Sequence, residues 1–393
     1  MYVTRPLSLY RKFPLTLASP PPEGPNSGIL VIQDEEAEET CCFGTCNSNQ
    51  VTSLPFPQNK KLAVRYSSGS GENSHVSRHD VVFIPVLDQP LSSNRYYAIK
   101  PRGRHKGEAF TSSTKEDGVT CCYCFFVCDV ESEEPDHHDI YQQFQICPEH
   151  WRGFHAKSVA SDGFPPYFLR RKGWTVQTSI PRNFILDEAP GLDTDLRARL
   201  PEFNFSVLNK SSNAVRVGKW YCPFLFVKDG RVKDQIQRSM YYEMTLEQRW
   251  EQIFACENNY NEDDGAVVDV VDVVVRKEAV AVTGKEVLID EIRVVDGVMW
   301  FGNFSNVERK GDVGLSLAIV ERMKWEVERF GWENGGENGE ERIKRVEQNV
   351  GIGKWRKFGC YVLVERFVLR RMDGSLVLTH DFKHTHHTRS KWE

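Results

Sequence analysis

Short apolar runs recur along the chain, separated by clusters of Gly, Ser, Asn and Asp. Runs of four to ten residues rich in branched and aromatic side chains, bounded by turn residues, are typical of β-strands. In the first two thirds of the chain the pattern predicts strands at Gly28–Gln33, Leu62–Tyr66, Val81–Val86, Tyr96–Lys100, Thr120–Val130, Trp174–Ile180 and Val215–Val227. In the last third it predicts Ala266–Val275, Val280–Ile289, Val298–Phe304, Cys360–Arg370 and Leu376–Asp381.

Helical periodicity is rarer. A short helix is expected at Leu192–Leu200, between a Gly and a Pro. A second is expected from Thr245 to Cys256, because Thr245 to Gln248 has the form of a capping box. The third is the best marked, since apolar residues recur at steps of four and three and predict one buried face. These residues are Leu315, Ile319, Met323, Val327 and Phe330.

A polar, acidic stretch at Asn258–Gly265 interrupts the pattern and is the best candidate for a domain boundary. The expected fold class is α+β, mainly antiparallel sheets with a few amphipathic helices, in two lobes. The predicted divisions are an extended Pro-rich lead-in (1–27), an N-terminal β-rich lobe (28–258) and a C-terminal α+β lobe (266–393). A weak internal duplication is also considered, because Gly-Lys-Trp occurs at both 218–220 and 353–355.

Composition narrows the function classes. The 393 residues carry a net charge of -5, which gives no overall attraction to nucleic acid, so a nucleic-acid partner is not expected. The eleven cysteines are an odd number without the spacing of a disulfide framework, which favours a reducing compartment. No apolar run is long enough for a membrane span or a signal peptide, so we expect a cytoplasmic protein.

Cysteine and histidine are densest at 121–150. The spacings of Cys121 to Cys124 and of Cys147 to His150 allow a metal site, for which Cys124, Cys128, Cys147 and His150 are the candidate ligands. Aromatic and branched residues between the cysteines favour a buried strand instead, with Cys124 and Cys128 on one face. His137 and His138 lie in an acidic turn and are interpreted as solvated.

The only local basic patch follows the predicted strand Tyr96–Lys100. Its candidate ligand-binding residues are Lys100, Arg102, Arg104, His105 and Lys106. A loop of this kind can hold a phosphate-bearing or otherwise anionic group, although a run of charges is also typical of a solvated loop.

No complete catalytic or nucleotide signature is present. Cys147 and Cys360 are possible nucleophiles, but no nucleophile elbow or phosphate-binding glycine loop accompanies them. The C-terminal His380, His384, His386 and His387 are interpreted as surface residues. We therefore predict a non-enzymatic binding or interaction protein without a cofactor, whose partner is a protein or an anionic ligand. The alternative is a cysteine- or metal-dependent enzyme that uses 121–150.

Several stretches together resemble an uncharacterised plant protein family, a domain of unknown function. They are the start Met1 to Ser8, the Pro20 to Glu35 region, Gly218 to Phe224 with Thr245 to Glu251, and the end at Val362 to Glu393, which closes on Lys-Trp-Glu. The resemblance spans nearly the whole chain and implies a plant source. It assigns no catalytic residue.

Overall fold

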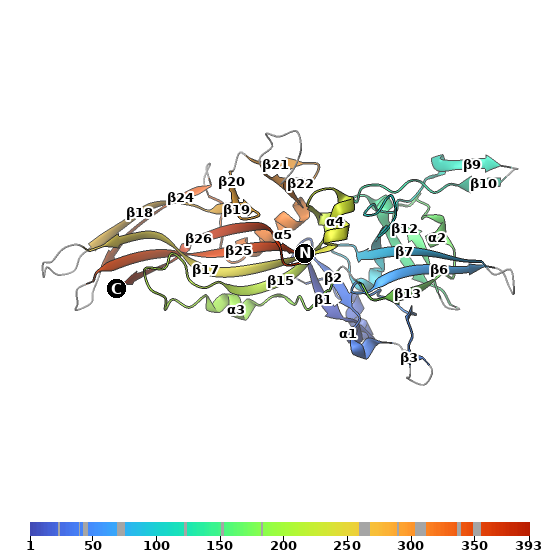
Figure 1. The fold of residues 1–393 in the computed structure, drawn as a ribbon, viewed down its shortest axis with the longest axis horizontal. Helices are drawn as coiled ribbons and strands as arrows, with labels where there is room; N and C mark the ends of the chain where they lie inside the picture. The colour runs from blue at the N-terminus through green and yellow to red at the C-terminus, as the bar shows by residue number, and fades with distance from the viewer. Residues whose placement is uncertain are drawn as a thin grey trace.

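The computed structural model describes residues 1–22, 24–38, 40–41, 46–68, 75–121, 124–150, 153–181, 184–258, 268–288, 291–302, 312–335, 339–348 and 355–393. Within them the molecule is elongated and β-rich (Figure 1). A seven-stranded sheet lies at one end, and long strands run toward the other end, where the C-terminus lies. The predicted class, with mainly antiparallel sheets and few helices, is confirmed.

The largest sheet has nine strands and extends along the long axis of the molecule. Its order is β2-β1-β15-β17-β25-β26-β19-β20, with β14 added beside β15, and only the β1–β2 pairing is parallel. The strands are β1 (Tyr2–Pro6), β2 (Gly28–Ile32), β14 (Gly191–Leu192), β15 (Val215–Pro223), β17 (Tyr241–Glu257), β19 (Glu278–Val282), β20 (Lys285–Val287), β25 (Lys357–Arg371) and β26 (Leu376–Trp392).

The seven-stranded sheet is formed by residues from the first half of the chain. It is ordered β12-β11-β8-β7-β6-β13-β5 and encloses a separate aromatic core with Phe56, Phe83 and Trp174. Its strands are β5 (Gln50–Val51), β6 (Lys61–Ser68), β7 (His75–Pro85), β8 (Arg95–Ile99), β11 (Gln143–Pro148), β12 (Phe154–Ser158) and β13 (Thr175–Ser179).

Smaller sheets and short helices complete the described chain. A four-stranded sheet contains β16 (Val227–Lys228), β23 (Val313–Ser316), β22 (Val298–Phe301) and β21 (Ile292–Val295). Two hairpins pair β3 (Thr40–Cys41) with β4 (Cys46–Asn47) and β9 (Gly118–Cys121) with β10 (Cys124–Val127). A further two-stranded sheet pairs β18 (Val268–Arg276) with β24 (Glu340–Gln348), which lie far apart in the sequence. The helices are α1 (Leu7–Lys12), α2 (Tyr167–Arg170), α3 (Thr194–Arg199), α4 (Val232–Arg238) and α5 (Leu317–Glu328), with single 3₁₀ turns at Pro14–Ala18, Glu35–Ala37, Leu91–Ser93, Lys115–Asp117, Ile140–Gln142 and Phe224–Phe226.

Two predicted helices are found and one is wrong. α3 and α5 lie where periodicity places them, and α5 buries Ile319, Met323 and Val327. Thr245 to Cys256 is not helical, because it belongs to β17, a strand of 17 residues. Alternate residues of this strand from Tyr242 to Trp250 are buried between β15 and β25, and this period of two overrides the capping-box signal.

The large sheet crosses the predicted domain boundary, and the domain division stays a prediction. The nine-stranded sheet combines β1, β2, β15 and β17 with β25 and β26, so both sides of Asn258–Gly265 build one sheet. Residues 259–265 of that stretch lie outside the described residues. The lead-in 1–27 is not simply extended, since Tyr2–Pro6 is a strand of the large sheet and Leu7–Lys12 is a helix. No membrane-spanning candidate is found among the described helices, because none is both long and apolar enough.

The possible duplication finds no matching placement in the described chain. Trp220 lies in β15, inside the large sheet, whereas Trp355 precedes β25, outside any strand. Gly353 and Lys354 lie outside the described residues.

Candidate functional site

One face of the seven-stranded sheet forms a wall of a cavity of about 400 Å³. Ala63 of β6 pairs with Asp80 of β7, and Lys61 pairs with Ser179 of β13. Because paired residues and every second residue along a strand share a face, Lys61, Ala63, Asp80, Val82 and Ser179 point to the same side. Leu62, Val64 and Phe83 alternate with them and pack into the aromatic core.

The opposite wall comes from the large sheet and from α4. Ile236 and Gln237 of the helix, together with Met240 and Tyr241 at the start of β17, line the cavity. The helix is held in place by buried Gln235, whose Nε2 donates a hydrogen bond of 2.6 Å to the Val227 carbonyl oxygen. The cavity therefore lies between the two sheets, at a place that only the tertiary fold brings together.

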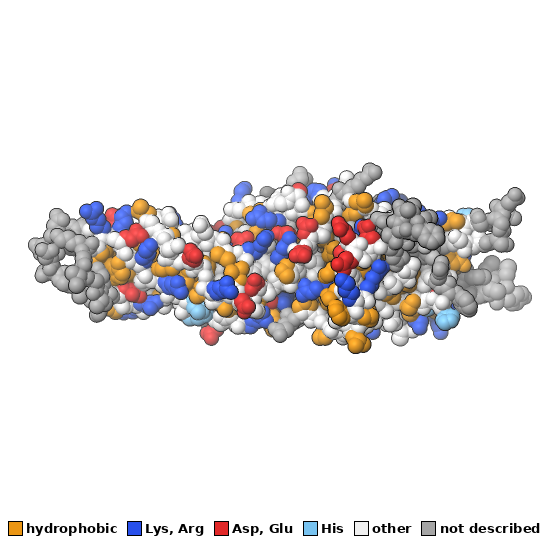
Figure 2. Space-filling view, turned by 90° about the horizontal axis from the view of Figure 1, so that it is seen from below, with side chains coloured by type: hydrophobic (Ala, Val, Ile, Leu, Met, Phe, Trp, Pro, Cys, Tyr) orange, Lys and Arg blue, Asp and Glu red, His pale blue; other side chains and the backbone are white. Residues whose placement is uncertain are grey.

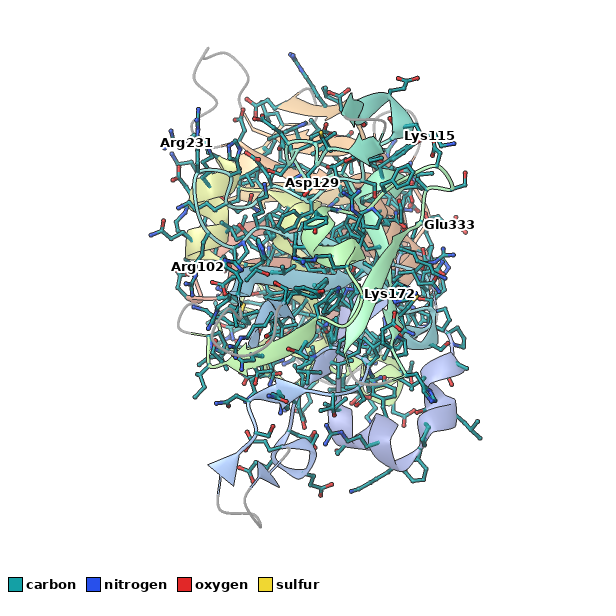
Figure 3. The ribbon with its side chains drawn as sticks, turned by 90° about the vertical axis from the view of Figure 1, so that its right-hand side faces the viewer. Arg102, Lys115, Asp129, Lys172, Arg231 and Glu333 are labelled. Atoms are coloured by element: carbon teal, nitrogen blue, oxygen red, sulfur yellow. The ribbon has the colours of Figure 1, made fainter. Side chains whose placement is uncertain are left out.

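The basic loop predicted from the sequence forms part of the rim. The loop closes on itself through backbone hydrogen bonds from Lys100 to Glu108 (2.9 Å) and from Gly107 to Lys100 (2.7 Å). Lys106 Nζ donates to Gln237 Oε1 of α4 at 2.8 Å. Arg102 forms an ion pair of 3.0 Å with Asp80 of β7. Figure 3 shows Arg102 on the same side of the molecule as Arg231 and α4.

Among the described residues that line the cavity, most of the charged side chains are cations. Lys60, Lys61, Arg102 and Lys106 line the cavity, against one carboxylate, that of Asp80. Lys60 lies 3.5 Å from Glu38, and Lys106 is bound to an amide rather than to an acid. On the face of the molecule shown in Figure 2, by contrast, side chains of both signs are interspersed.

The five predicted loop residues have different surroundings in the structure. Arg102 and Lys106 line the cavity, whereas Arg104 is exposed and His105 is 2.9 Å from Glu108. Lys100 donates to Ser132 Oγ at 2.8 Å and lies 5.0 Å from the centre of the Phe110 ring. Together with Arg102, Lys100 lines a neighbouring, shallower hollow. Two of the five residues therefore face the cavity.

Sequence reasoning missed the residues that other elements bring to the cavity. Tyr241 is fully buried and its hydroxyl has no hydrogen-bond partner among the described residues. Burial also raises the pKa of Tyr241, so the hydroxyl keeps its proton and can donate. Lys60 and Lys61 are an adjacent basic pair at the start of β6, which is a faint signal in the sequence. Tyr241 lies far along the chain, just before the segment predicted to be helical from Thr245, and gave no signal.

The candidate metal ligands do not form a described site. Cys124 begins β10 in a hairpin with β9, but its side chain and residues 122–123 lie outside the described part of the chain. Cys128 is exposed just after this hairpin, Cys147 is half-buried in β11 opposite His155, and His150 is exposed. No metal-binding group of three or more ligand side chains occurs among the described residues.

The predicted single strand Thr120–Val130 is instead this two-stranded hairpin, which projects from the body of the molecule (Figure 1). Cys128 is therefore not a buried strand residue, as alternation had suggested. The metal prediction as a whole stays a prediction. The other possible nucleophile, Cys360, is buried, and burial raises the pKa of its thiol, which favours the unreactive protonated form.

The C-terminal histidines are not all at the surface. His380 and His384 are 2% and 0% exposed, because β26 continues to Trp392 as a strand of the large sheet rather than ending near Asp381. His380 lies 2.9 Å from Glu278 and His384 lies 3.0 Å from Glu365. The surface interpretation is wrong for these two residues.

His384 belongs to a buried ionic network whose described residues line neither the cavity between the two sheets nor the neighbouring hollow at Lys100. Arg197 of α3 binds both carboxylate oxygens of Glu365 in β25, at 2.7 and 2.6 Å. Its guanidinium also donates to the Glu326 carbonyl of α5, and Glu326 in turn pairs with Arg322 at 2.6 Å. Burial opposes ionisation of Glu365, but hydrogen bonds from His384 and Arg197 outweigh it and lower its pKa to about 2. The network joins elements and offers no open position for chemistry.

A second hollow, of about 1120 Å³, lies between the loop at 134–138 and the four-stranded sheet. His137 lines it half-buried, with its ring centre 5.1 Å from that of Phe226, so it is not a solvated loop residue as expected. Burial and the neighbouring His138 lower the pKa of His137 to about 4. Acids and bases are mixed along this hollow, which gives no preference for one ligand charge.

Comparisons with known proteins identify one family model that matches part of the chain. No curated protein matches the chain. Among solved structures, the crystal structure of Cry35Ab1 has a TM-score of 0.46 and 11% identity, over 86% of this chain and 90% of that chain. A likeness at this level carries no argument.

Residues 23–123 match a family model described as a protein of unknown function. That range contains Lys60, Lys61, Asp80, Arg102 and Lys106 of the cavity. The plant source and the terminal motifs stay predictions. Residues 23–123 are therefore similar to the domain of unknown function DUF1262, which confirms the expected domain of unknown function over that range.

Proposed function

We propose that the protein is a non-enzymatic binding protein that takes a small molecule with an anionic group, phosphate first, into the cavity between the two sheets. The observation that carries the proposal is the convergence of Lys60, Lys61, Arg102 and Lys106 on one cavity with a single opposing carboxylate. Guanidinium and ammonium groups bind phosphate and carboxylate oxygens through charge-assisted hydrogen bonds. Such bonds strengthen where the cavity walls exclude water.

Tyr241 supports the same interpretation. A buried hydroxyl without a partner costs free energy, and such groups usually find a partner in the folded protein. Tyr241 is one of the residues that line the cavity, and its hydroxyl lacks a partner among the described residues. An oxygen atom of a bound molecule would satisfy it.

The experiment measures binding of ethyl phosphate and hexyl phosphate by calorimetry, with hexanol as the uncharged control. In the variant Arg102→Glu/Lys106→Glu we expect at least a roughly tenfold loss of affinity, since a hydrogen bond to a charged group contributes about 1.5 kcal/mol or more. Arg104→Glu is the control in the same loop, because it reverses one charge away from the cavity, as each of the two substitutions does at the cavity. Binding should also weaken as salt is raised.

Equal loss of affinity in Arg104→Glu would show that the loop acts through its overall charge and would overturn the cavity assignment. Equal binding of hexanol and hexyl phosphate would overturn the anion preference. Circular dichroism and thermal unfolding of each variant separate loss of binding from loss of folding.

We also propose the cytoplasm as the location. Within the described chain, Cys128, Cys147, Cys222, Cys256 and Cys360 are free thiols, which suits a reducing compartment. Cell fractionation with the full chain tests this, and recovery in an oxidising compartment would contradict it.

A further inference from the structure

The interior of the cavity is apolar although its rim is charged. Aliphatic and aromatic residues from both walls line it, among them Ala63, Val82, Phe184, Ile236, Met240 and Tyr241. Ala63, Phe184, Ile236, Met240 and Tyr241 are all buried. A free phosphate ion would satisfy the cations and leave this apolar surface without a partner.

The cations and the apolar surface lie at different depths. Arg102 is 69% exposed at its side chain, whereas Ile236, Met240 and Tyr241 are at most 4% exposed. The Arg102 guanidinium is thus near solvent, whereas the side chains of Ile236, Met240 and Tyr241 are inside. Resting on the proposed function, we infer that the ligand is an anionic amphiphile, with its head at Arg102 and Lys106 and its apolar body between β6–β7 and α4.

The size of the cavity agrees with a single small molecule. A volume of about 400 Å³ lies within the range of sites that enclose small ligands, roughly 300–1000 Å³. It suits a short chain or a ring system with one acidic group. A folded protein partner could not place its body there.

The test is a chain-length series of ethyl, butyl, hexyl and octyl phosphate titrated into the full chain. Burial of each added methylene is expected to raise affinity by roughly fourfold until the cavity is full. If ethyl phosphate binds as tightly as octyl phosphate, the amphiphile inference is wrong while the anion site stands. If no phosphate binds at any length, the proposed function itself fails.

A cavity-filling variant provides the matched structural test. Ala63→Leu adds apolar volume to the β6 wall and changes no charge. It should leave the affinity for ethyl phosphate within about twofold and abolish most of the gain from ethyl to octyl phosphate. An undiminished gain in a variant that unfolds at the wild-type temperature would place the alkyl chain elsewhere and overturn the inference. Should Ala63→Leu fail to fold, Val82→Leu, on the same face, gives the same comparison.

The head group could belong to a free amphiphile or to a lipid in a bilayer. Ile180 and Ile185, which flank the lining residues Ser179 and Phe184 in the sequence, are 80% and 72% exposed, so apolar contact outside the cavity is also present. Co-sedimentation with phosphatidylcholine vesicles, with and without phosphatidic acid, distinguishes the sources. Competition of octyl phosphate with vesicle binding supports one shared site. Vesicle binding in a protein that does not bind octyl phosphate would overturn the cavity as the site.

Discussion

At the scale of single residues, Tyr241 combines a well-packed ring with a buried hydroxyl that burial destabilises. Its ring fills the boundary between the large sheet and the cavity, and lies 5.4 Å from the Phe184 ring centre. Its hydroxyl, however, is buried without a partner in the described chain. A residue chosen for packing alone would be phenylalanine, so the hydroxyl is the atom that needs an explanation.

We expect Tyr241→Phe to stabilise the ligand-free protein by roughly 1 kcal/mol, because it removes the desolvation penalty of an unpaired hydroxyl and keeps the ring. Urea unfolding of the ligand-free chain measures this. A loss of stability would show that the hydroxyl is hydrogen-bonded after all, and the support it gives to a ligand would then disappear. Tyr242→Phe is the contrasting variant, because the Tyr242 hydroxyl is hydrogen-bonded to Asp229 at 3.1 Å and its removal should destabilise.

At the scale of elements, the pairing of β1 with β2 in the large sheet depends on close contact between the Tyr2 ring and the Gly28 backbone. Tyr2 pairs with Gly28 across the parallel β1–β2 ladder. A Cβ atom on Gly28 would lie 2.3 Å from Cε1 of the Tyr2 ring, which is fully buried and donates from its hydroxyl to the Pro85 carbonyl at 2.8 Å. The strand pair therefore requires glycine at this position.

Gly28→Ala is expected to destabilise the protein by about 1–3 kcal/mol, since the Tyr2 ring cannot move away without losing its hydrogen bond. Chemical denaturation measures the cost. In a Tyr2→Ala background the same change should cost little, because the ring is gone. Additive costs in the double variant would contradict the predicted steric contact.

At the scale of the whole molecule, one buried ionic network ties distant parts of the chain together. Arg197 and Glu365, which are 3% and 0% exposed, join α3 to β25, while the Glu326 carbonyl adds α5 and His384 adds β26. Removing one partner of a buried pair leaves the other charge without compensation, which is far more costly than losing a surface pair.

Glu365→Gln should destabilise the protein by about 3 kcal/mol. The pH dependence has a defined sign. Because the folded pKa of Glu365 is about 2, below its unfolded value, its stabilisation is complete above about pH 4.5 and is lost as the pH falls toward 2. Unfolding curves between these values should therefore converge for wild type and Glu365→Gln. Parallel curves would contradict the assignment. Glu36→Gln, in the exposed pair with Lys12, is the control and should leave the midpoint unchanged.

Much of the local structure could be predicted from the sequence. Gly28–Gln33, Tyr96–Lys100 and the periodic helix that became α5 were placed within a few residues, because patterns of period two and 3.6 are local. The helix predicted from Thr245 is wrong because four residues of capping signal compete with the alternating burial along a 17-residue strand. The predicted basic loop reached the cavity through Arg102 and Lys106, but nothing local distinguished them from Arg104.

The sequence by itself determined that the chain is β-rich, that α5 has one apolar face, and that positive charge gathers at 100–106, since each depends on neighbouring residues. Only the tertiary structure decided that β1 and β26 share a sheet, that His384 and Glu365 are buried partners, and that Tyr241 meets Arg102 and Lys106 around one cavity. The first and the last of these outcomes depend on which faces pack together over separations of more than a hundred residues, whereas His384 and Glu365 meet through the register of the neighbouring strands β25 and β26. Periodicity specifies that a face is buried and leaves open what covers it.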